Sequence, residues 1–177
     1  MTALNVLGGE DLALGEDRRQ LLRFSLSEAL YCLPIEHIRE ILQVARMTRV
    51  PMMPKFVRGV MNLRGAVVPV LDLALRLGLK PTQVGRRSCV VIIESVMHDG
   101  NLQRHGVLVD AVHEVLEIPM DQLNPVPALG TRVDPQFIAG VIRAHNQSME
   151  MLDVTRVFDD TELSRLVANH GRQALLH

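Results

Sequence analysis

The sequence is poor in aromatic residues, in cysteine and in net charge. Aromatic side chains make up 3% of the 177 residues and Trp is absent, which argues against a stacking platform for single-stranded nucleic acid. The net charge of −1 argues against a protein that coats DNA. Two cysteines, Cys32 and Cys89, set no disulfide framework. We therefore expect no nucleic-acid partner.

Long apolar runs are also missing. No stretch approaches the roughly 20 apolar residues of a membrane-spanning helix, and the first residues lack the pattern of a signal peptide. We expect a cytoplasmic protein without direct membrane insertion. Hydrophobic residues still make up 47% of the chain, and a chain of this length buries about 70% of its unfolded surface. Much of that apolar content is Val and Ile, which favour strands.

Alternating apolar residues predict a mainly β protein. Leu22, Phe24 and Leu26 alternate with polar neighbours, the period of a half-buried strand. Further strands are predicted at 31–35, 56–62, 66–71, 89–95, 104–110, 114–118, 137–143 and 149–154. Pro69 lies inside one of them and predicts an edge strand or a bulge at that point.

The remaining segments are expected to be a tail and helices. Residues 1–19 show no periodicity and are expected to be a flexible tail. A short helix is expected over 72–77, ending at Gly78. Asp159 followed by Glu162 is typical of a helix start, so a C-terminal helix is predicted over 161–177.

An internal repeat is the most informative pattern in the sequence. Residues 56–60 (FVRGV) match 137–141 (FIAGV) at an offset of 81, and at the same offset 71–73 (LDL) match 152–154 (LDV). A second block, 35–42, aligns with 109–116 at an offset of 74. Matching Gly, Pro and acid positions in two ordered blocks predict two similar lobes, each a small barrel of about five strands.

The sequence contains no motif that is typical of a known catalytic or metal site. Its histidines are spread over different elements and there is no Cys-x-x-Cys, so we predict no metal site. Cys32 near His37 could pair a nucleophile with a base, but Cys32 fits a strand core better. Asp72 and Asp153 could form an acid dyad, but turn and cap roles explain them better. We therefore assign no catalytic residue.

The segment 59–73 (GVMNLRGAVVPVLDL) has a tip that its repeat partner lacks. Asn62-Leu63-Arg64-Gly65 has no counterpart in the residues 143–146 (RAHN). Arg carries five donors in a planar fork, which suits carboxylates and helix-end carbonyls. A solvated hairpin tip is the plainer alternative for Arg64.

The segment carries a family resemblance. Together with 35–41 (IEHIREI), Pro51 and Pro54, residues 56–73 resemble the CheW-like domain of bacterial chemosensory adaptors, and the match continues to 137–141. It covers roughly residues 20–160, which we expect to form one domain of two lobes.

The resemblance implies a fold and an activity. It implies two SH3-like five-stranded β-barrels packed around a core, in agreement with the repeat, and no enzymatic activity or cofactor. It also implies a cytoplasmic adaptor, held at membrane-associated receptor arrays through its partners. Those partners would be the cytoplasmic tip of a chemoreceptor (a methyl-accepting chemotaxis protein) and a CheA-type histidine kinase.

Six positions match the receptor-contacting elements of the family: Ile38, Glu40, Gly59, Val60, Asn62 and Arg64. By the resemblance, Arg64 is the polar anchor, Ile38 and Val60 supply apolar contact, and Asn62 fixes the turn. Asn62 could equally be purely structural, and Glu40 a solvated strand residue.

Three other functions remain open at this point. The chain could serve a non-flagellar chemosensory system that controls pili or surface behaviour. It could be a kinase-binding regulator without receptor contact. It could also be an unrecognised enzyme of small-barrel fold, which a deep polar pocket with converging titratable groups would favour.

Overall fold

The computed structural model describes residues 17–96, 99–128, 130–144, 146–161 and 163–165. Its strands are β1 (Arg18–Leu26), β2 (Ala29–Pro34), β3 (Ile38–Gln43), β4 (Val57–Leu63), β5 (Ala66–Asp72), β6 (Cys89–Val96), β7 (Leu102–Val109), β8 (Ala111–Pro119), β9 (Leu123–Asn124), β10 (Ile138–Ala144) and β11 (Gln147–Leu152). The short helices are η1 (Ile35–His37), α2 (Leu73–Arg76), η2 (Met120–Gln122), η3 (Pro135–Phe137) and α3 (Val154–Val157).

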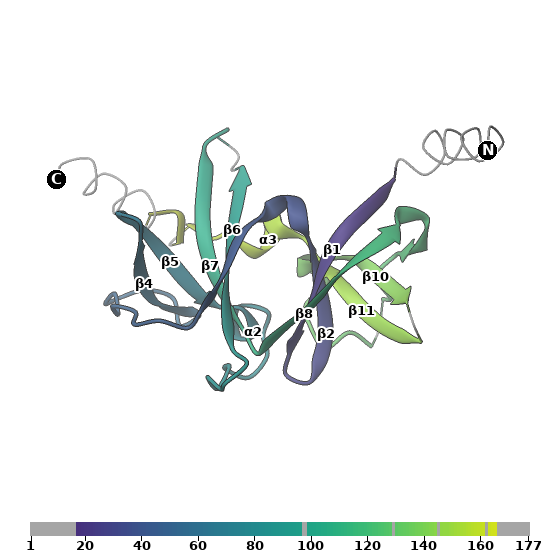
Figure 1. Cartoon of the computed structure of the whole chain (residues 1–177), viewed down its shortest axis with the longest axis horizontal. Coiled ribbons are helices and arrows are strands. Elements are labelled where there is room, and N and C mark those ends of the chain that lie inside the picture. The colour runs from purple at the N-terminus through teal and green to yellow at the C-terminus, as the bar shows by residue number, and fades with distance from the viewer. Residues whose placement is uncertain (1–16, 97–98, 129, 145, 162, 166–177) are drawn as a thin grey trace, which may run out of the picture.

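The strands form two sheets, which confirms the mainly β prediction. One has six strands in the order β8-β1-β2-β11-β10-β9, and the other has five in the order β3-β6-β7-β5-β4. Figure 1 shows the two sheets curling into lobes that lie side by side, with α2 and α3 between them. We call them the six-stranded lobe and the five-stranded lobe.

The two lobes are interleaved in the sequence. The chain enters the six-stranded lobe with β1 and β2, passes to the five-stranded lobe for β3 to β7, and returns for β8 to β11. The crossings are η1 and the single residue Asp110 between β7 and β8. The lobes are therefore not consecutive halves of the chain, although their strands follow the same plan.

The structure confirms the repeat down to its irregularities. A register shift separates Val57 from Gly59 in the β4–β5 pair, and the equivalent shift separates Ile138 from Gly140 in β10–β11. The 74-residue offset is confirmed as well. The shift between Ile38 and Glu40 on β3 has its counterpart on β8, where Val112 pairs with Phe24 and Val115 with Leu22.

The repeated acids are helix caps, as the sequence predicts. The carboxylate of Asp72 accepts from the backbone N–H of Leu75 at 3.1 Å, and that of Asp153 accepts from the N–H of Arg156 at 3.2 Å. Each satisfies one of the donors that the first turn of a helix leaves unpaired. This cap role replaces the alternative of an acid dyad.

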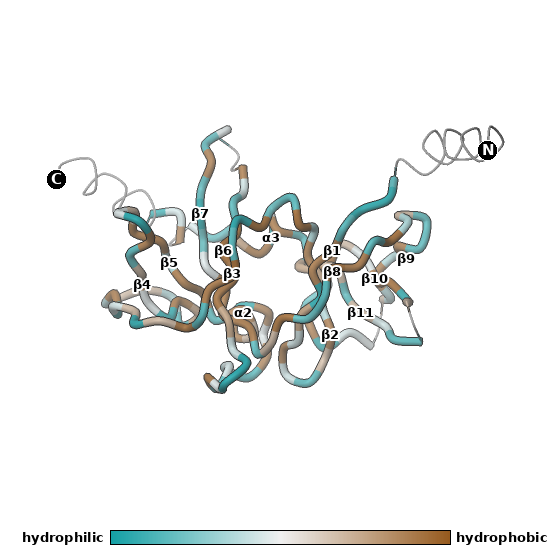
Figure 2. The backbone as a smooth tube through the Cα atoms, viewed as in Figure 1, coloured by the Kyte–Doolittle hydropathy of each residue, from teal (hydrophilic) through white to brown (hydrophobic). Residues whose placement is uncertain are grey.

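Three apolar clusters hold the molecule together. One fills the six-stranded lobe with Leu21, Cys32, Ile142 and their neighbours. Another fills the five-stranded lobe around Val70, Val90 and Ile92. The third contains residues of both lobes and therefore forms a core shared between them; its members include Phe24, Tyr31, Val91, Val107, Phe137, Leu152 and Phe158. In Figure 2 the start of β1 is hydrophilic, while α2, between the lobes, is largely hydrophobic.

Some boundaries differ from the sequence prediction. β1 already begins at Arg18, because Arg18 and Arg19 pair with Pro119 and Ile118 of β8. Pro69 carries no bulge; it pairs with Val60, and β5 pairs with β7 only from Val70 on. Pro69 therefore lies where β5 has a single neighbour, which its missing N–H allows.

The predicted C-terminal helix is described only at its start. The cap there is Asp160 rather than Asp159, because the Asp160 carboxylate accepts from the N–H of Leu163 at 3.0 Å. Leu163 is fully buried in the shared core. The rest of this helix and most of the predicted tail lie outside the described residues.

Candidate functional site

The six residues predicted from the sequence lie where the two edges of the five-stranded sheet, β3 and the β4–β5 hairpin, approach each other. We call this region the seam; its residues are Ile38, Glu40, Gly59, Val60, Asn62 and Arg64. Ile38 and Glu40 are on β3, while Gly59, Val60 and Asn62 are on β4. β3 and β4 are the two outermost strands of this sheet. The chain closes the barrel beyond β3, where Thr48 pairs with Val60 through backbone bonds of 2.8 Å in both directions. The structure therefore brings these residues together.

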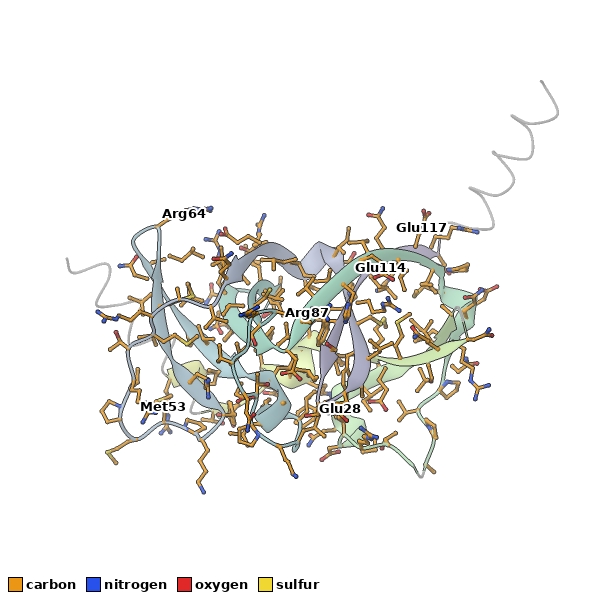
Figure 3. All side chains as sticks on the ribbon, turned by 60° about the horizontal axis from the view of Figure 1, so that its bottom comes forward. Glu28, Met53, Arg64, Arg87, Glu114 and Glu117 are labelled. Atoms are coloured by element: carbon orange, nitrogen blue, oxygen red, sulfur yellow. The ribbon has the colours of Figure 1, made fainter. Side chains whose placement is uncertain are left out.

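Arg64 stands at the tip of the β4–β5 hairpin, on the outer surface of the molecule (Figure 3). Its side chain is 77% exposed, and one guanidinium nitrogen lies 2.9 Å from a carboxylate oxygen of Glu40. The pair spans the seam from β4–β5 to β3. An exposed pair of this kind is worth about 0.2–1 kcal/mol, so a partner's carboxylate or carbonyl can displace Glu40 at little cost.

The hairpin tip is held in an unusual backbone conformation. Arg64 has φ 53° and Gly65 φ 87°, so both central residues are left-handed, as in the tight turns that match the twist of a hairpin. The Asn62 Oδ1 accepts from the backbone N–H of Gly65 at 2.9 Å. Asn62 therefore fixes the turn and presents Arg64.

Gly59 and Val60 lie beneath this surface. Both are buried, and Val60 belongs to the shared core. Ile38 is partly buried and packs against the same core. Of the six predicted residues, Glu40, Asn62 and Arg64 expose polar side chains, whereas Ile38, Gly59 and Val60 support the site from below or along its edge.

A second ionic cluster adjoins the seam, and sequence reasoning missed it. Glu94 of β6 binds two guanidinium groups, those of Arg39 on β3 and of Arg104 on β7, the latter at 3.0 Å. Hydrogen bonds from both hold the pKa of Glu94 below its usual range. Arg39 and Arg104 lie far apart in the sequence, and the order of the strands, with β6 between β3 and β7, brings the three side chains together.

The six-stranded lobe has a different arrangement at the matching positions. Glu114, which is 74 residues after Glu40, pairs with Arg23 of β1 at 2.6 Å instead of with a hairpin tip. Arg23 also donates to the amide oxygen of Gln147 at 2.7 Å. The tip that carries Arg64 is therefore a feature of the five-stranded lobe among the described residues.

Catalytic and metal sites find no support in the described residues. Cys32 is fully buried, and burial raises the pKa of its thiol to about 12, so it stays protonated. No group of three or more His, Cys, Asp or Glu there is placed to hold a metal ion.

A hollow of about 480 Å³ beside β1, η1 and β8 is lined by Arg18, Arg19, Glu36 and Glu117. It is an open, charged surface rather than the enclosed pocket that the enzyme hypothesis requires.

Membrane crossing by a helix finds no support either. Within the described ranges, none of the helices combines the length and the apolarity needed to span a bilayer.

Comparisons with known proteins point to one family. A family model described as the CheW-like domain matches residues 20–162. The chain is 30% identical over 152 residues to the probable chemotaxis protein CheW of Rhizobium etli, covering 85% of this chain and 94% of that protein. It is 26% identical over 158 residues to protein FrzA of Myxococcus xanthus, covering 88% and 94%.

A solved structure shows the same fold. The scaffolding protein TtCheW from Thermoanaerobacter tengcongensis superposes with a TM-score of 0.72 at 30% identity, over 81% of this chain and 90% of that one.

Proposed function

Because the chain belongs to the CheW-like domain family, whose model covers residues 20–162, we propose that it is a chemotaxis adaptor that couples chemoreceptor tips to a CheA-type histidine kinase. The observation that carries the proposal is Arg64 at its fixed turn, exposed and paired with Glu40. The proposed role is structural, and no step of it is catalytic.

The seam suits the tip of a receptor, which is a helical hairpin. A helix packs its apolar face against apolar side chains, and here Ile38 and the edge of the shared core supply them. A polar rim sets the register of such a contact, and Glu40, Asn62 and Arg64 form that rim. Arg64 would exchange Glu40 for a carboxylate or a helix-end carbonyl of the receptor. A single interface of this size is weak, and repeated copies in an array would strengthen it.

Signalling would follow from shared contacts rather than from chemistry. The adaptor would hold the kinase beside the receptor, and a change in the receptor would favour one of two kinase arrangements. This role would place the protein at receptor arrays in the cytoplasm.

The pathway that this adaptor serves is a second question. Similarity to FrzA extends over 88% of the chain, as broad as the similarity to proteins named CheW. A chemosensory system other than the flagellar one is therefore the alternative setting for the same coupling role.

Arg64→Ala is expected to weaken binding of a receptor cytoplasmic fragment at least about tenfold, because a charge-assisted hydrogen bond is worth about 1.5–3 kcal/mol. The melting temperature should stay the same, since Arg64 is 77% exposed. The measurement is fluorescence anisotropy with a labelled fragment, beside a thermal melt. The matched control is Arg86→Ala, an exposed arginine in the segment between α2 and β6.

Three outcomes contradict this role of Arg64. Equal affinities of Arg64→Ala and Arg86→Ala would remove Arg64 from the contact. A large fall in melting temperature would make Arg64 structural. Binding of the kinase but not of the receptor by the wild type would favour the kinase-binding regulator.

A further inference from the structure

Arg76, the last residue of α2, lies between the two lobes. Its guanidinium carbon is 4.9 Å from the ring centroid of Phe56 and 4.7 Å from that of Phe137. Both distances are within the range in which a cation is attracted to an aromatic ring. One ring precedes β4 of the five-stranded lobe, and the other ends η3 and precedes β10 of the six-stranded lobe. A single side chain therefore touches an aromatic residue of each lobe.

The same guanidinium binds backbone carbonyls of the six-stranded lobe. Its Nε donates to the carbonyl of Val157 at 2.8 Å, and an Nη donates to those of Arg156 at 3.4 Å and Asp159 at 3.2 Å. These carbonyls belong to the end of α3 and the residues after it, where a helix leaves its oxygens unpaired. Arg76 thus reaches from the five-stranded lobe to the end of α3, which follows β11 of the other lobe.

The two rings are equivalent residues of the internal repeat. Phe56 and Phe137 stand 81 residues apart, and each backbone carbonyl accepts from the N–H of a helix-capping acid, Asp72 at 2.7 Å and Asp153 at 2.9 Å. At the same offset the partner of Arg76 is Val157, which has no cation. The repeat therefore provides two equivalent phenylalanines but one arginine, and this arginine contacts both rings.

Directional contacts matter here because the core that the two lobes share is apolar. The shared core attracts the two lobes, but apolar attraction is not directional and tolerates rotation of one surface on another. The planar guanidinium, with two rings and three carbonyls around it, accepts one orientation only. Burial lowers the pKa of Arg76, while Asp160 and Asp159 oppose that effect.

We propose that Arg76 fixes the orientation of the two lobes and is thereby a positioning residue for the seam that carries Arg64. The link to the seam runs through the shared core, since Val60 is part of it and Ile38 packs against it. This second part rests on the proposed adaptor function, whereas the effect on lobe orientation does not.

The test measures the distance between the lobes in the free protein. Spin labels are attached to Arg58→Cys on β4 and Glu117→Cys on β8, both exposed, in a Cys89→Ser background, while Cys32 is fully buried. The wild type should give one narrow distance distribution by pulsed electron resonance. Arg76→Met should broaden it about twofold, since lobes without a directional contact are free to move. Arg76→Lys should fall between the two, since it keeps the charge and loses the planar fork.

Phe56→Leu provides a milder variant in case Arg76→Met does not fold. It removes one ring and leaves Arg76 its carbonyls, so a broader distribution is again expected. The proposal is overturned if the distance distribution of Arg76→Met has the same mean and width as that of the wild type. If Arg76→Met does not fold, the same result for Phe56→Leu overturns it.

Receptor binding then tests the link to the seam. Arg76→Met should bind a receptor cytoplasmic fragment about tenfold more weakly, because a less ordered site pays more to bind, and Arg76→Lys should restore part of the affinity. A broadened distance distribution with unchanged affinity would refute the positioning role alone. Failure of the wild type to bind the fragment would refute the adaptor function and leave the distance result standing.

Discussion

Gly59→Ala should lower the free energy of unfolding by about 3 kcal/mol, because the added Cβ would clash with a neighbouring backbone and because the residue has a positive φ. A Cβ on Gly59 would lie 2.6 Å from the carbonyl oxygen of Thr48, and Gly59 has φ +155°. Thr48 cannot withdraw, since its backbone bonds to Val60 close the barrel. The substitution therefore strains the backbone and opens the seam together.

The measurement for Gly59 is a urea titration or a thermal melt. At about 2–4 °C for each kcal/mol in a domain of this size, the melting temperature should fall by roughly 6–12 °C. Gly85→Ala is the control, because an added Cβ there meets nothing within 4 Å. Equal stability of the two variants would contradict the close approach. The result also bears on function, because partner binding lost in Gly59→Ala would report a disrupted seam rather than a lost contact.

His105 should make the stability of the fold depend on pH. Its side chain is fully buried on β7, and neither ring nitrogen has a hydrogen-bond partner among the described residues. The ring stacks on Phe158 with a distance of 4.3 Å between centroids. Burial lowers the pKa of His105 from 6.5 to about 4. The unfolded chain therefore binds a proton on His105 between pH 6.5 and about 4, and the folded chain does not. The full stability is present above pH 6.5 and falls as the pH decreases towards 4.

The size of this effect follows from the shift in pKa. Each unit is worth about 1.4 kcal/mol, so the wild type should lose on the order of 3 kcal/mol between pH 7 and pH 4 through His105 alone. His105→Phe keeps an aromatic ring against Phe158 and cannot titrate. Urea denaturation of both proteins across this range isolates the effect, since the carboxylates are common to both. Parallel curves for the two proteins would show that His105 does not titrate on unfolding.

The repeat predicted more of the fold than any single strand pattern did. Local turn and cap chemistry is encoded within a few residues, so the caps at Asp72 and Asp153 and the turn at Asn62 to Gly65 could be predicted from the sequence. The interleaving of the lobes could not, because strand periodicity does not tell which sheet a strand joins. Tyr31 on β2 and His105 on β7 are an example. They lie 74 residues apart and occupy matching, buried positions in the two sheets, but they are different residue types, so the sequence alone does not show that the positions correspond.

The candidate site was predicted in part for the same reason. Arg64 and Glu40 could be singled out from the family pattern, but their ion pair depends on the closing of the barrel between β3 and β4. Glu94 with its two arginines joins three strands, and Arg76 joins both lobes. Residues that are far apart in the sequence show no regular spacing, so a single sequence does not reveal that they are in contact. The burial of Gly59 and Val60 likewise becomes visible only in three dimensions.

Fold and proposed function meet at the seam. The repeat supplies two barrels and the shared core joins them. Among the described residues, the five-stranded lobe alone places an exposed arginine on a fixed turn beside an exchangeable carboxylate. The proposed adaptor needs these features to be rigid and its contacts to be reversible, and weak surface pairing on a well-packed scaffold provides both.

The most direct test of the adaptor role asks whether this chain bridges its two proposed partners. A receptor cytoplasmic fragment and the regulatory domain of a CheA-type kinase from the same cell would be mixed at tens of micromolar and analysed by sedimentation velocity, with the chain present or absent. We expect a ternary complex only when the chain is present, and its loss with Arg64→Ala while the binary complex with the kinase persists. A chain that binds neither partner, or a complex that forms equally well without it, would contradict the coupling role.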